Sequence, residues 1–253
     1  MKKTTLLFMV FIAAIVRHAA AYDIHDETLR YRVMYKWGLI NKQAGSVTID
    51  TESTGDGFFN SKLTGRSASW ADHIYSVRDT LLGRVNATTY EPVFYEKIAR
   101  EDGDYKHDRI TFHRKGQDVI GKCHRVKRRK KDSIDTVIDT TLHATGMTVD
   151  ILSAFYYMRH LDYARMKPGE SVKATIFSGK KKELLRITYH GVQSIEIDRK
   201  NVETYYITFT FTSDEGKKSS DDMFAWISTD PRRVPLKMKG NLPIGSIQCF
   251  LED

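Results

Sequence analysis

The chain has 253 residues, 41% of them hydrophobic, and its 40 Lys and Arg against 32 Asp and Glu give a formal net charge of +8. A chain of this length can bury enough surface to fold without a structural metal or a disulfide, and its length allows one large or two small domains. A membrane-spanning helix needs about 17 or more consecutive apolar residues. No segment approaches that length, so the sequence excludes a helical membrane anchor.

The first 21 residues have the layout of a cleaved secretory signal. A basic start at residues 1–3 precedes the uncharged apolar run 6–16, and three Ala residues at 19–21 end the segment. This order predicts cleavage after Ala21 and export to the periplasm. With no Cys near the cut, a lipid-modified N-terminus is excluded. The expected mature chain is 22–253, and its net charge falls to about +5 because three basic residues leave with the signal.

Alternation of apolar and polar residues with a period of two dominates the rest of the chain. In residues 31–37 and 204–212, aromatic and branched side chains alternate with Arg, Lys or Thr, which is typical of half-buried strands. Residues 185–189 follow the same pattern, and His190-Gly191 predicts a turn from them into a strand over 192–197. Further strands are expected at 46–50, 57–63, 93–99, 109–113, 172–177, 223–228, 234–239 and 246–250.

Two segments have helical spacing instead. Apolar residues recur at 70, 74, 77 and 81 after Ser67 or Ser69, either of which could cap a short helix. The second segment is 148–160, where Asp150 can act as the cap and apolar residues cover nearly all sides. A helix that is apolar all round is a buried helix.

These elements predict a mainly β fold. Many short strands with turn residues between them, and no regular helical crossovers, favour an antiparallel sheet over a parallel one. We expect a curved sheet, a half-barrel or barrel-like wrap, around the short buried helix at 148–160, with one further short helix. The sequence contains no internal repeat and no low-complexity linker, so we expect one β-rich domain over 22–253.

A basic block covers residues 122–131 and ends in Lys127, Arg128, Arg129, Lys130 and Lys131. In an exported protein, such a block could bind anionic lipid, lipopolysaccharide phosphates or acidic glycan, and we expect no nucleic-acid partner. The simpler interpretation is a solvated hairpin tip or an edge strand, where Lys and Arg prevent pairing between sheets. We favour it because acidic residues follow at once.

The two cysteines, Cys123 and Cys249, leave two alternatives open. In an oxidising compartment they could form a disulfide. Two separate thiols, buried or at an edge, are the simpler alternative, since cysteines far apart in sequence carry no information on their geometry.

Tyr156, Tyr157 and Arg159 are the best candidates for ligand-facing residues. Aromatic tips together with an Arg can line a pocket. The alternative, which we favour because their helix is apolar on all sides, is that they lock the helix inside the sheet through hydrogen bonds to the strands.

Motifs for a specific reaction are missing from the sequence. It contains no G-x-S-x-G nucleophile elbow, no H-E-x-x-H or C-x-x-C metal motif, and no glycine-rich phosphate loop before a helix. His107 and His113 would share one strand face but lie too far apart to hold one metal ion. The sequence therefore indicates no catalytic residue, no metal and no cofactor.

Short segments spread along the chain match one family pattern in order. They are Trp37-Gly38 with Ala44-Gly45, Tyr-Ser-Val-Arg-Asp at 75–79, Glu-Pro-Val-Phe-Tyr at 91–95, Asp-Ile-Leu-Ser-Ala-Phe-Tyr-Tyr-Met-Arg at 150–159, Trp-Ile-Ser-Thr-Asp at 226–230 and Arg-Val-Pro at 233–235. Over nearly the whole mature chain the sequence thus resembles a bacterial exported family known as domain of unknown function 3108. The resemblance implies a β-rich envelope protein of Gram-negative bacteria, and it brings no activity and no catalytic residues.

We expect a periplasmic, monomeric, non-enzymatic protein that carries or senses an apolar or anionic envelope ligand in the concavity of its sheet. One alternative is an envelope glycan or lipid hydrolase, which would need a cleft with converging polar groups of perturbed pKa. Another is a structural partner of an outer-membrane complex, which would show a large exposed apolar patch. A concavity filled with side chains would exclude the carrier and leave a scaffold or partner-binding role.

Overall fold

The computed structural model describes residues 24–131, 134–179, 181–213, 216–217 and 220–252, and the predicted signal peptide lies outside them. Within these ranges, fifteen strands and two helices are present. The strands are β1 (Glu27–Trp37), β2 (Ile40–Ser53), β3 (Phe58–Ser67), β4 (Val77–Asn86), β5 (Pro92–Glu101), β6 (Asp104–Lys115), β7 (Asp118–Arg128), β8 (Thr136–Thr145), β9 (Thr148–Val149), β10 (Ser171–Phe177), β11 (Lys182–Ile197), β12 (Lys200–Ser213), β13 (Met223–Ser228), β14 (Pro235–Asn241) and β15 (Ser246–Glu252). The helices are α1 (Ser69–Asp72) and α2 (Ile151–His160).

All these strands belong to one sheet, which is built as two wings. Strands β1 to β8 form the N-terminal wing and β10 to β15 the C-terminal wing, and in each wing every strand pairs antiparallel with the next along the chain. The pairing of β1 with β15 joins the wings, and the two-residue strand β9 adds to β10 in the parallel direction. The sheet therefore has two edges, β8 and β9.

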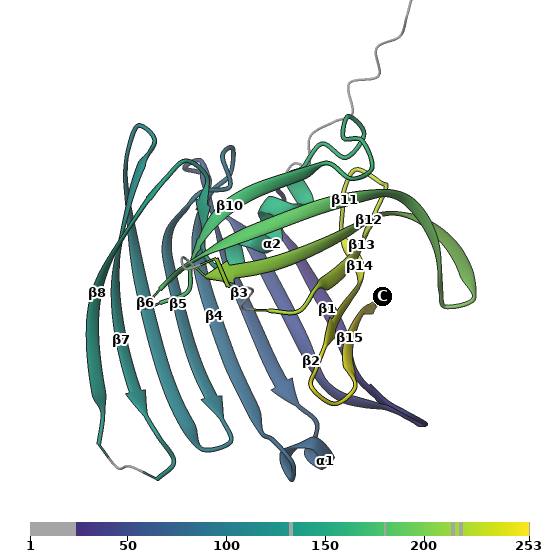
Figure 1. Ribbon diagram of the computed structural model, residues 1–253, viewed down its shortest axis with the longest axis horizontal. Coiled ribbons are helices and arrows are strands. Elements are labelled where there is room, and N and C mark those ends of the chain that lie inside the picture. Colours follow the sequence, from purple (N-terminus) through teal and green to yellow (C-terminus); the bar gives the residue numbers. More distant parts are fainter. Residues whose placement is uncertain (1–23, 132–133, 180, 214–215, 218–219, 253) are drawn as a thin grey trace, which may run out of the picture.

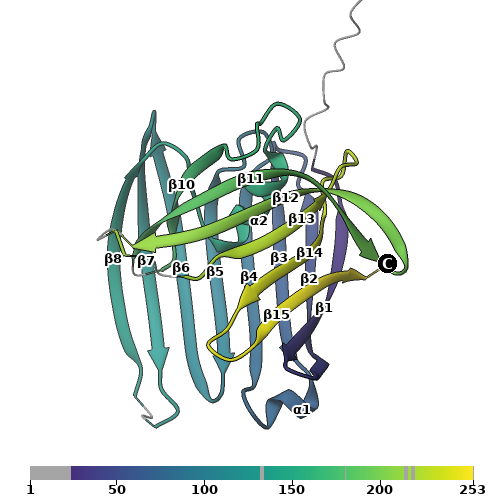
Figure 2. The same ribbon diagram turned by 45° about the vertical axis from the view of Figure 1, so that its right-hand side comes forward.

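The wings enclose a concavity that contains α2. In Figures 1 and 2, the green and yellow strands of the C-terminal wing pass across the concave side of the N-terminal wing, and α2 lies between them. The predicted curved antiparallel sheet around a short buried helix is confirmed. No helix in the described residues is long and apolar enough to cross a bilayer.

Side chains also connect the wings on the side away from β1 and β15. Arg125 of β7 pairs with Asp108 of β6, and its guanidinium donates to the carbonyl of Ser178, 3.2 Å away in the turn after β10. Phe177 stacks on Phe112 with ring centroids 5.7 Å apart. The ring of Phe177 also lies where a side chain at Gly121 would be, since an added Cβ would be 2.5 Å from it. Only glycine allows this approach.

The further short helix is present as α1, but its predicted extension to residues 77 and 81 is wrong. The structure keeps only α1, one turn long, and residues 77 and 81 belong to β4. Strand β4 pairs with β3 on one side and β5 on the other, and its residues 81, 83 and 85 are buried on one face. Pairing on both sides and burial outweigh a local helical spacing that β-branched residues support only weakly.

The turn predicted at His190-Gly191 is also wrong. Strand β11 continues through this point to Ile197, and the register with β12 shifts between Tyr189 and Gly191. Gly191 has a φ of +106°, which suits a β-bulge that absorbs one extra residue. The glycine therefore bends a long strand instead of ending it.

Helix α2 begins as the sequence predicts. The Asp150 carboxylate accepts hydrogen bonds from the backbone N–H groups of Leu152 (2.7 Å) and Ser153 (2.9 Å), and the Ser153 hydroxyl lies 2.9 Å from the backbone N–H of Asp150. This capping box satisfies donors that would otherwise be unpaired inside the protein. Eight of the ten residues of α2 are buried, so the helix fills the part of the concavity that it occupies.

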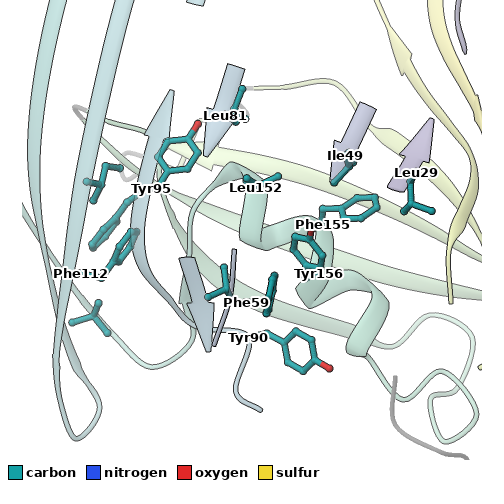
Figure 3. Packing of buried hydrophobic residues seen from close by; sticks show 14 of the residues in the cluster. Leu29, Ile49, Phe59, Leu81, Tyr90, Tyr95, Phe112, Leu152, Phe155 and Tyr156 are labelled. Carbon is teal, nitrogen blue, oxygen red and sulfur yellow. The ribbon is translucent and has the colours of Figure 1, made fainter. Parts of the chain in front are cut away.

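Aromatic and branched side chains of α2 and of the N-terminal wing form the larger part of the core. In Figure 3, Leu152, Phe155 and Tyr156 of α2 point toward side chains of the surrounding strands, among them Ile49 and Phe59. A second cluster joins the opposite side of α2 to the C-terminal wing and includes Tyr157 and Tyr163. The helix is therefore the shared core of both wings.

Replacing Asp150 tests how its buried carboxyl contributes. Burial raises the pKa of Asp150 to about 6, above the 3.8 of an exposed carboxyl, while its hydrogen bonds from Ser153 and Leu152 oppose the rise. A raised acid pKa contributes stability below pH 3.8 that is lost as pH rises through about 6. Asp150→Asn keeps the cap and cannot ionise. We expect the free energy of unfolding of wild type, relative to Asp150→Asn, to fall across this window in urea titrations.

Asp150→Ala serves as the comparison. It removes the cap, and we expect it to lower the free energy of unfolding by about 1–3 kcal/mol at every pH, because the cap is lost and buried N–H donors lose their acceptor. A difference between wild type and Asp150→Asn that stays constant with pH would show that the carboxyl titrates normally.

Candidate functional site

Tyr156, predicted as a candidate ligand contact, lies fully buried against the N-terminal wing. Its hydroxyl is 2.7 Å from Thr51 Oγ1 on β2 and 2.6 Å from Ser61 Oγ on β3. Its ring meets Phe59 edge-on, with centroids 4.7 Å apart. The hydroxyl is therefore engaged by the sheet, as the packing alternative predicts.

Arg159, the second candidate, connects α2 to both wings. Its side chain is completely buried, and its guanidinium forms a bidentate pair with Glu27 of β1, with Nη2 3.2 Å from Oε2. Nη2 and Nε also donate to the carbonyls of Arg232 and Arg233, at 2.9 and 3.2 Å, in the segment before β14. Arg233 in turn donates to the carbonyl of Leu161, just after α2. The two arginines thus interlock the helix with the C-terminal wing.

Tyr157, the third candidate, lies in the core cluster of the C-terminal wing. Burial raises the pKa of its hydroxyl. All three candidates are buried residues of α2. None of them lines the cavity described below.

The basic block runs along the end of β7 into the tip of the β7–β8 hairpin, with residues 122–128 in the strand and 129–131 in the turn. Arg128 pairs with Asp135 at 2.8 Å, and the backbone N–H of Lys130 donates to Asp104 at 2.9 Å. Within the described part of the chain, Arg129 and Lys131 have no ion-pair partner, and both are exposed. Part of the block is therefore neutralised and part presents free positive charge.

Cys123 and Cys249 are free thiols in the structure. Cys123 lies on β7 and Cys249 on β15, with six strands between them in the sheet. Burial raises the pKa of each thiol to about 11. The structure thus has the two separate thiols of the simpler alternative, and their raised pKa makes both poor nucleophiles.

Five chain segments come together at one end of the sheet, which we call the lower rim because it is at the bottom of Figure 1. They are residues 36–42, 66–78, 100–106, the described parts of 127–135 (127–131 and 134–135) and 237–245. Their position follows from the hairpin registers, since Trp37 lies opposite Ile40, Arg66 opposite Arg78, Glu101 opposite Asp104, Lys127 opposite Thr136 and Asn241 opposite Ser246. The pairing of Lys36 with Ser246 places the last segment beside the first.

A cavity of about 620 Å³, the rim cavity, lies between the sheet and the lower rim. Most residues that line it are apolar: Val33, Tyr35 and Val47 of β1 and β2, Trp70, Ala71, Ile74, Tyr75 and Val77 around α1, and Leu242, Pro243, Ile244 and Ile247 of the β14–β15 hairpin. No residue of α2 is among them. The helix therefore fills one part of the concavity and leaves an apolar space at the lower rim, of a size typical of small-molecule sites.

Glycine and a bulge shape the wall of the rim cavity. The register of β1 with β2 shifts after Val33, which lies opposite Gly45, while Met34 lies opposite Gln43. A Cβ on Gly45 would lie 2.4 Å from the carbonyl oxygen of Arg66, so only glycine fits there. The extra residue, Ala44, lines the cavity. A bulge bends its strand, and here the bend opens the wall toward the rim.

Polar contacts hold α1 over the rim cavity. Arg78 donates to Asp72 through both terminal nitrogens, at 3.0 and 2.6 Å. These bonds, with a further one from Ser67, hold the pKa of Asp72 below its ordinary value. The indole N–H of Trp70 donates to the carbonyl of Gln43 at 2.6 Å, which fixes the ring against β2. The aromatic wall is thus fixed by hydrogen bonds at its edge.

The β14–β15 turn covers the cavity from the other wing. The hydroxyl of Tyr35 donates to the carbonyl of Ile244 at 3.2 Å. Gly245 has a φ of +80°, and a Cβ there would lie 2.4 Å from the carbonyl oxygen of Lys36. The turn therefore packs closely on the end of β1 and carries Leu242 and Ile244 to the cavity.

Titratable groups gather elsewhere, on the outward face of β5 and β6. Glu96 lies 2.6 Å from His107 and 2.9 Å from Arg109. Burial raises the pKa of Glu96, but hydrogen bonds from His107 and Arg109 outweigh this effect and lower it overall. Among the described residues, no three His, Cys, Asp or Glu side chains are placed to hold a metal ion. We interpret this cluster as an ion pair that supports the outer face.

Comparison with known proteins places this fold in a family. The model of a family described as "Protein of unknown function (DUF3108)" matches residues 30–252. The chain belongs to this family. A search of curated proteins found no match.

One solved structure is similar over almost the whole chain. It is the crystal structure of a beta-barrel-like protein of domain of unknown function DUF1849 from Brucella abortus. The match has a TM-score of 0.63 and 10% sequence identity, and it covers 92% of this chain and 98% of that one. At this identity the similarity concerns the fold alone, and it agrees with the barrel-like wrap seen here.

Sequence reasoning missed the rim cavity, although one signal was available. Two turns of the lower rim carry apolar residues where turns are usually polar: Trp37-Gly38-Leu39-Ile40 and Leu242-Pro243-Ile244. Exposed apolar residues in turns at the same end of a sheet indicate a binding surface. Only the second turn lines the rim cavity, and its position beside the first depends on the pairing of β1 with β15, which the sequence does not show.

Tyr156→Phe tests whether Tyr156 locks the helix. The substitution leaves two buried hydroxyls, on Thr51 and Ser61, without this partner, so we expect the free energy of unfolding to fall by about 1–3 kcal/mol in urea titrations. Tyr157→Phe is the control, with an expected change within about 0.5 kcal/mol. Binding of an apolar fluorescent probe should be the same in both variants. Weaker probe binding by Tyr156→Phe alone would instead place this hydroxyl at the ligand.

Arg159→Met tests the connection between α2 and the wings. Removing a buried guanidinium leaves Glu27 without its charge partner and two carbonyls without donors, so we expect a loss of about 3–5 kcal/mol. In a Glu27→Gln background the same substitution should cost less, because no buried charge is left. Equal losses in the two backgrounds would mean that the ion pair contributes nothing beyond packing.

Proposed function

We propose that this protein binds the apolar part of an amphiphilic envelope ligand in the rim cavity. The observation that carries the proposal is the cavity itself: about 620 Å³ of apolar space that α2 leaves unfilled. The cavity is open to solvent on one side, and an exposed apolar surface of this kind marks an interaction site. Apolar walls with few polar groups are typical of ligand sites.

A positive charge beside the cavity favours a ligand with an anionic head. The Lys42 ammonium lies 4.6 Å from the centroid of the Trp70 ring, one wall of the cavity. A cation held over an indole face stays at the boundary between apolar surface and water. An acyl chain in the cavity would bring an acidic head group within reach of this ammonium.

Export supports the same proposal. Residues 1–21 have the order of a secretory signal, and the family resemblance implies an envelope protein. We therefore propose the periplasm as the location, where amphiphiles with acyl chains are the abundant apolar ligands. The cavity walls favour binding over hydrolysis, because the ionisable side chains along them are those of Tyr35, Arg66 and Tyr75, and burial raises the pKa of Tyr75.

Filling the rim cavity tests the proposal. Val33→Trp and Val47→Trp each place a large ring into the cavity from β1 or β2. We expect either variant to bind a fluorescent fatty acid about tenfold or more weakly, since the apolar surface available to the chain is lost. The matched control is Val192→Trp, at an exposed position of β11 outside the cavity. Displacement titrations measure the affinity, and thermal unfolding confirms the fold.

Native mass spectrometry of the protein purified from its own cells identifies the natural ligand. We expect an amphiphile to co-purify with wild type and with Val192→Trp, and to be missing from Val33→Trp. Probe binding that survives in both cavity-filling variants would contradict the proposal and leave a scaffold role.

A further inference from the structure

The lower rim carries most of the large apolar side chains that the described residues expose. Of the thirteen exposed side chains of this kind, eight lie on it. They come from four turns that are separate in sequence, and the most exposed are Leu39 (105%), Ile134 (78%), Ile74 (75%) and Ile244 (60%). Scattered apolar residues on a surface are normal, but their gathering on one edge marks an interaction site.

Positive charge gathers on the same edge. In sequence, the five segments of the lower rim hold thirteen Lys and Arg against six Asp and Glu, Asp132 included. Their net charge of +7 exceeds the net charge of about +5 of the expected mature chain, so the rest of that chain is slightly acidic. Several acids are already paired, such as Asp72 with Arg78 and Asp135 with Arg128, while Arg129 and Lys131 have no ion-pair partner in the described structure. The rim therefore presents free cations beside apolar tips.

Two lysines of β14, the strand that leads into the β14–β15 turn of the rim, lie over aromatic rings of the neighbouring strands. The ammonium of Lys237 lies 4.8 Å from the Trp226 ring and 5.4 Å from the Phe250 ring, and that of Lys239 lies 5.6 Å from the Phe224 ring. A surface that carries both exposed apolar side chains and unpaired cations matches a bilayer surface, where acyl chains lie beneath anionic head groups. A protein partner would need its own acidic ring around an apolar centre, and a second copy of this chain would bring two basic rims together at an electrostatic cost.

We propose that the lower rim docks on the surface of an anionic phospholipid bilayer. The apolar side chains of the β1–β2 turn, of the segment after α1 and of the β14–β15 turn enter the head-group region, and the basic residues of the β7–β8 tip contact lipid phosphates. Trp70, Ile74 and Ile244 also line the rim cavity, so the docked protein holds the cavity against the lipid. Docking is independent of whether the cavity holds a ligand.

Vesicle flotation with the purified protein tests the docking. Wild type should bind vesicles of phosphatidylethanolamine and phosphatidylglycerol more tightly than vesicles of phosphatidylcholine, and more weakly as salt rises. The triple variant Trp37→Ser, Leu39→Ser, Ile244→Ser should lose about tenfold or more in partition to the anionic vesicles. A control with the exposed Ile151→Ser and Val192→Ser, away from the rim, should bind as wild type does.

The basic residues are tested in the same way. Arg129→Gln, Lys130→Gln, Lys131→Gln should reduce binding to the anionic vesicles about tenfold or more and leave binding to phosphatidylcholine unchanged. The matched control neutralises three exposed lysines elsewhere: Lys62→Gln, Lys115→Gln, Lys173→Gln. Because all these side chains are exposed, the variants should keep the wild-type melting temperature.

Several results would overturn the docking proposal. They are an absence of binding to anionic vesicles, equal losses in the rim and control variants, or a wild-type dimer that the apolar triple variant turns into a monomer without any change in vesicle binding. The cavity-filling variants keep the proposals distinct. Val33→Trp should bind vesicles as wild type does even though it no longer binds the fatty-acid probe.

Discussion

The buried guanidinium of Arg159 is the interaction on which the architecture depends. A charge without water must be paired, and Glu27 and two backbone carbonyls provide the partners. These partners come from the first strand and from the segment before β14, so one side chain on α2 is bound to both wings. The reciprocal bond from Arg233 to the carbonyl of Leu161 fixes the end of the helix. Such a set tolerates little displacement, because every shift leaves a buried polar group unpaired.

The position of α2 then decides where the molecule is full and where it is hollow. The helix is ten residues long, whereas the N-terminal wing has strands of ten to fourteen residues. Because α2 spans only part of the concavity, α1 and the β14–β15 turn cover the rest. Both are small, and hydrogen bonds at their edges hold them, as from Trp70 to the carbonyl of Gln43 and from Tyr35 to that of Ile244. The rim cavity is therefore a consequence of the short length of α2. The hydrogen bonds at the edges of α1 and of the β14–β15 turn hold its walls in place.

Binding in the cavity and docking at the rim use the same edge for different reasons. The cavity depends on inward-facing residues of β1 and β2, and docking depends on turn residues that point away from the sheet. An amphiphile in transit between a bilayer and the cavity would stay in contact with apolar surface throughout, because Ile74 and Ile244 are both exposed and part of the wall. Such continuity lowers the cost of moving an acyl chain through water.

The sequence by itself determined the strand alternation, a helix within 148–160 with its Asp150 cap, the exposure of the basic block at a hairpin tip or an edge strand, and the family. These features depend on neighbours in the chain: a period of two, a capping residue, a run of like charges. Tertiary structure alone decided that residues 77–86 form a strand, and it supplied the partners of Tyr156 and Arg159, for which the sequence only favoured packing. It also brought Tyr35, Ile74 and Ile244 together around a cavity. Each of these outcomes depends on pairing between distant strands, above all β1 with β15, and local patterns carry no information on which distant segments meet.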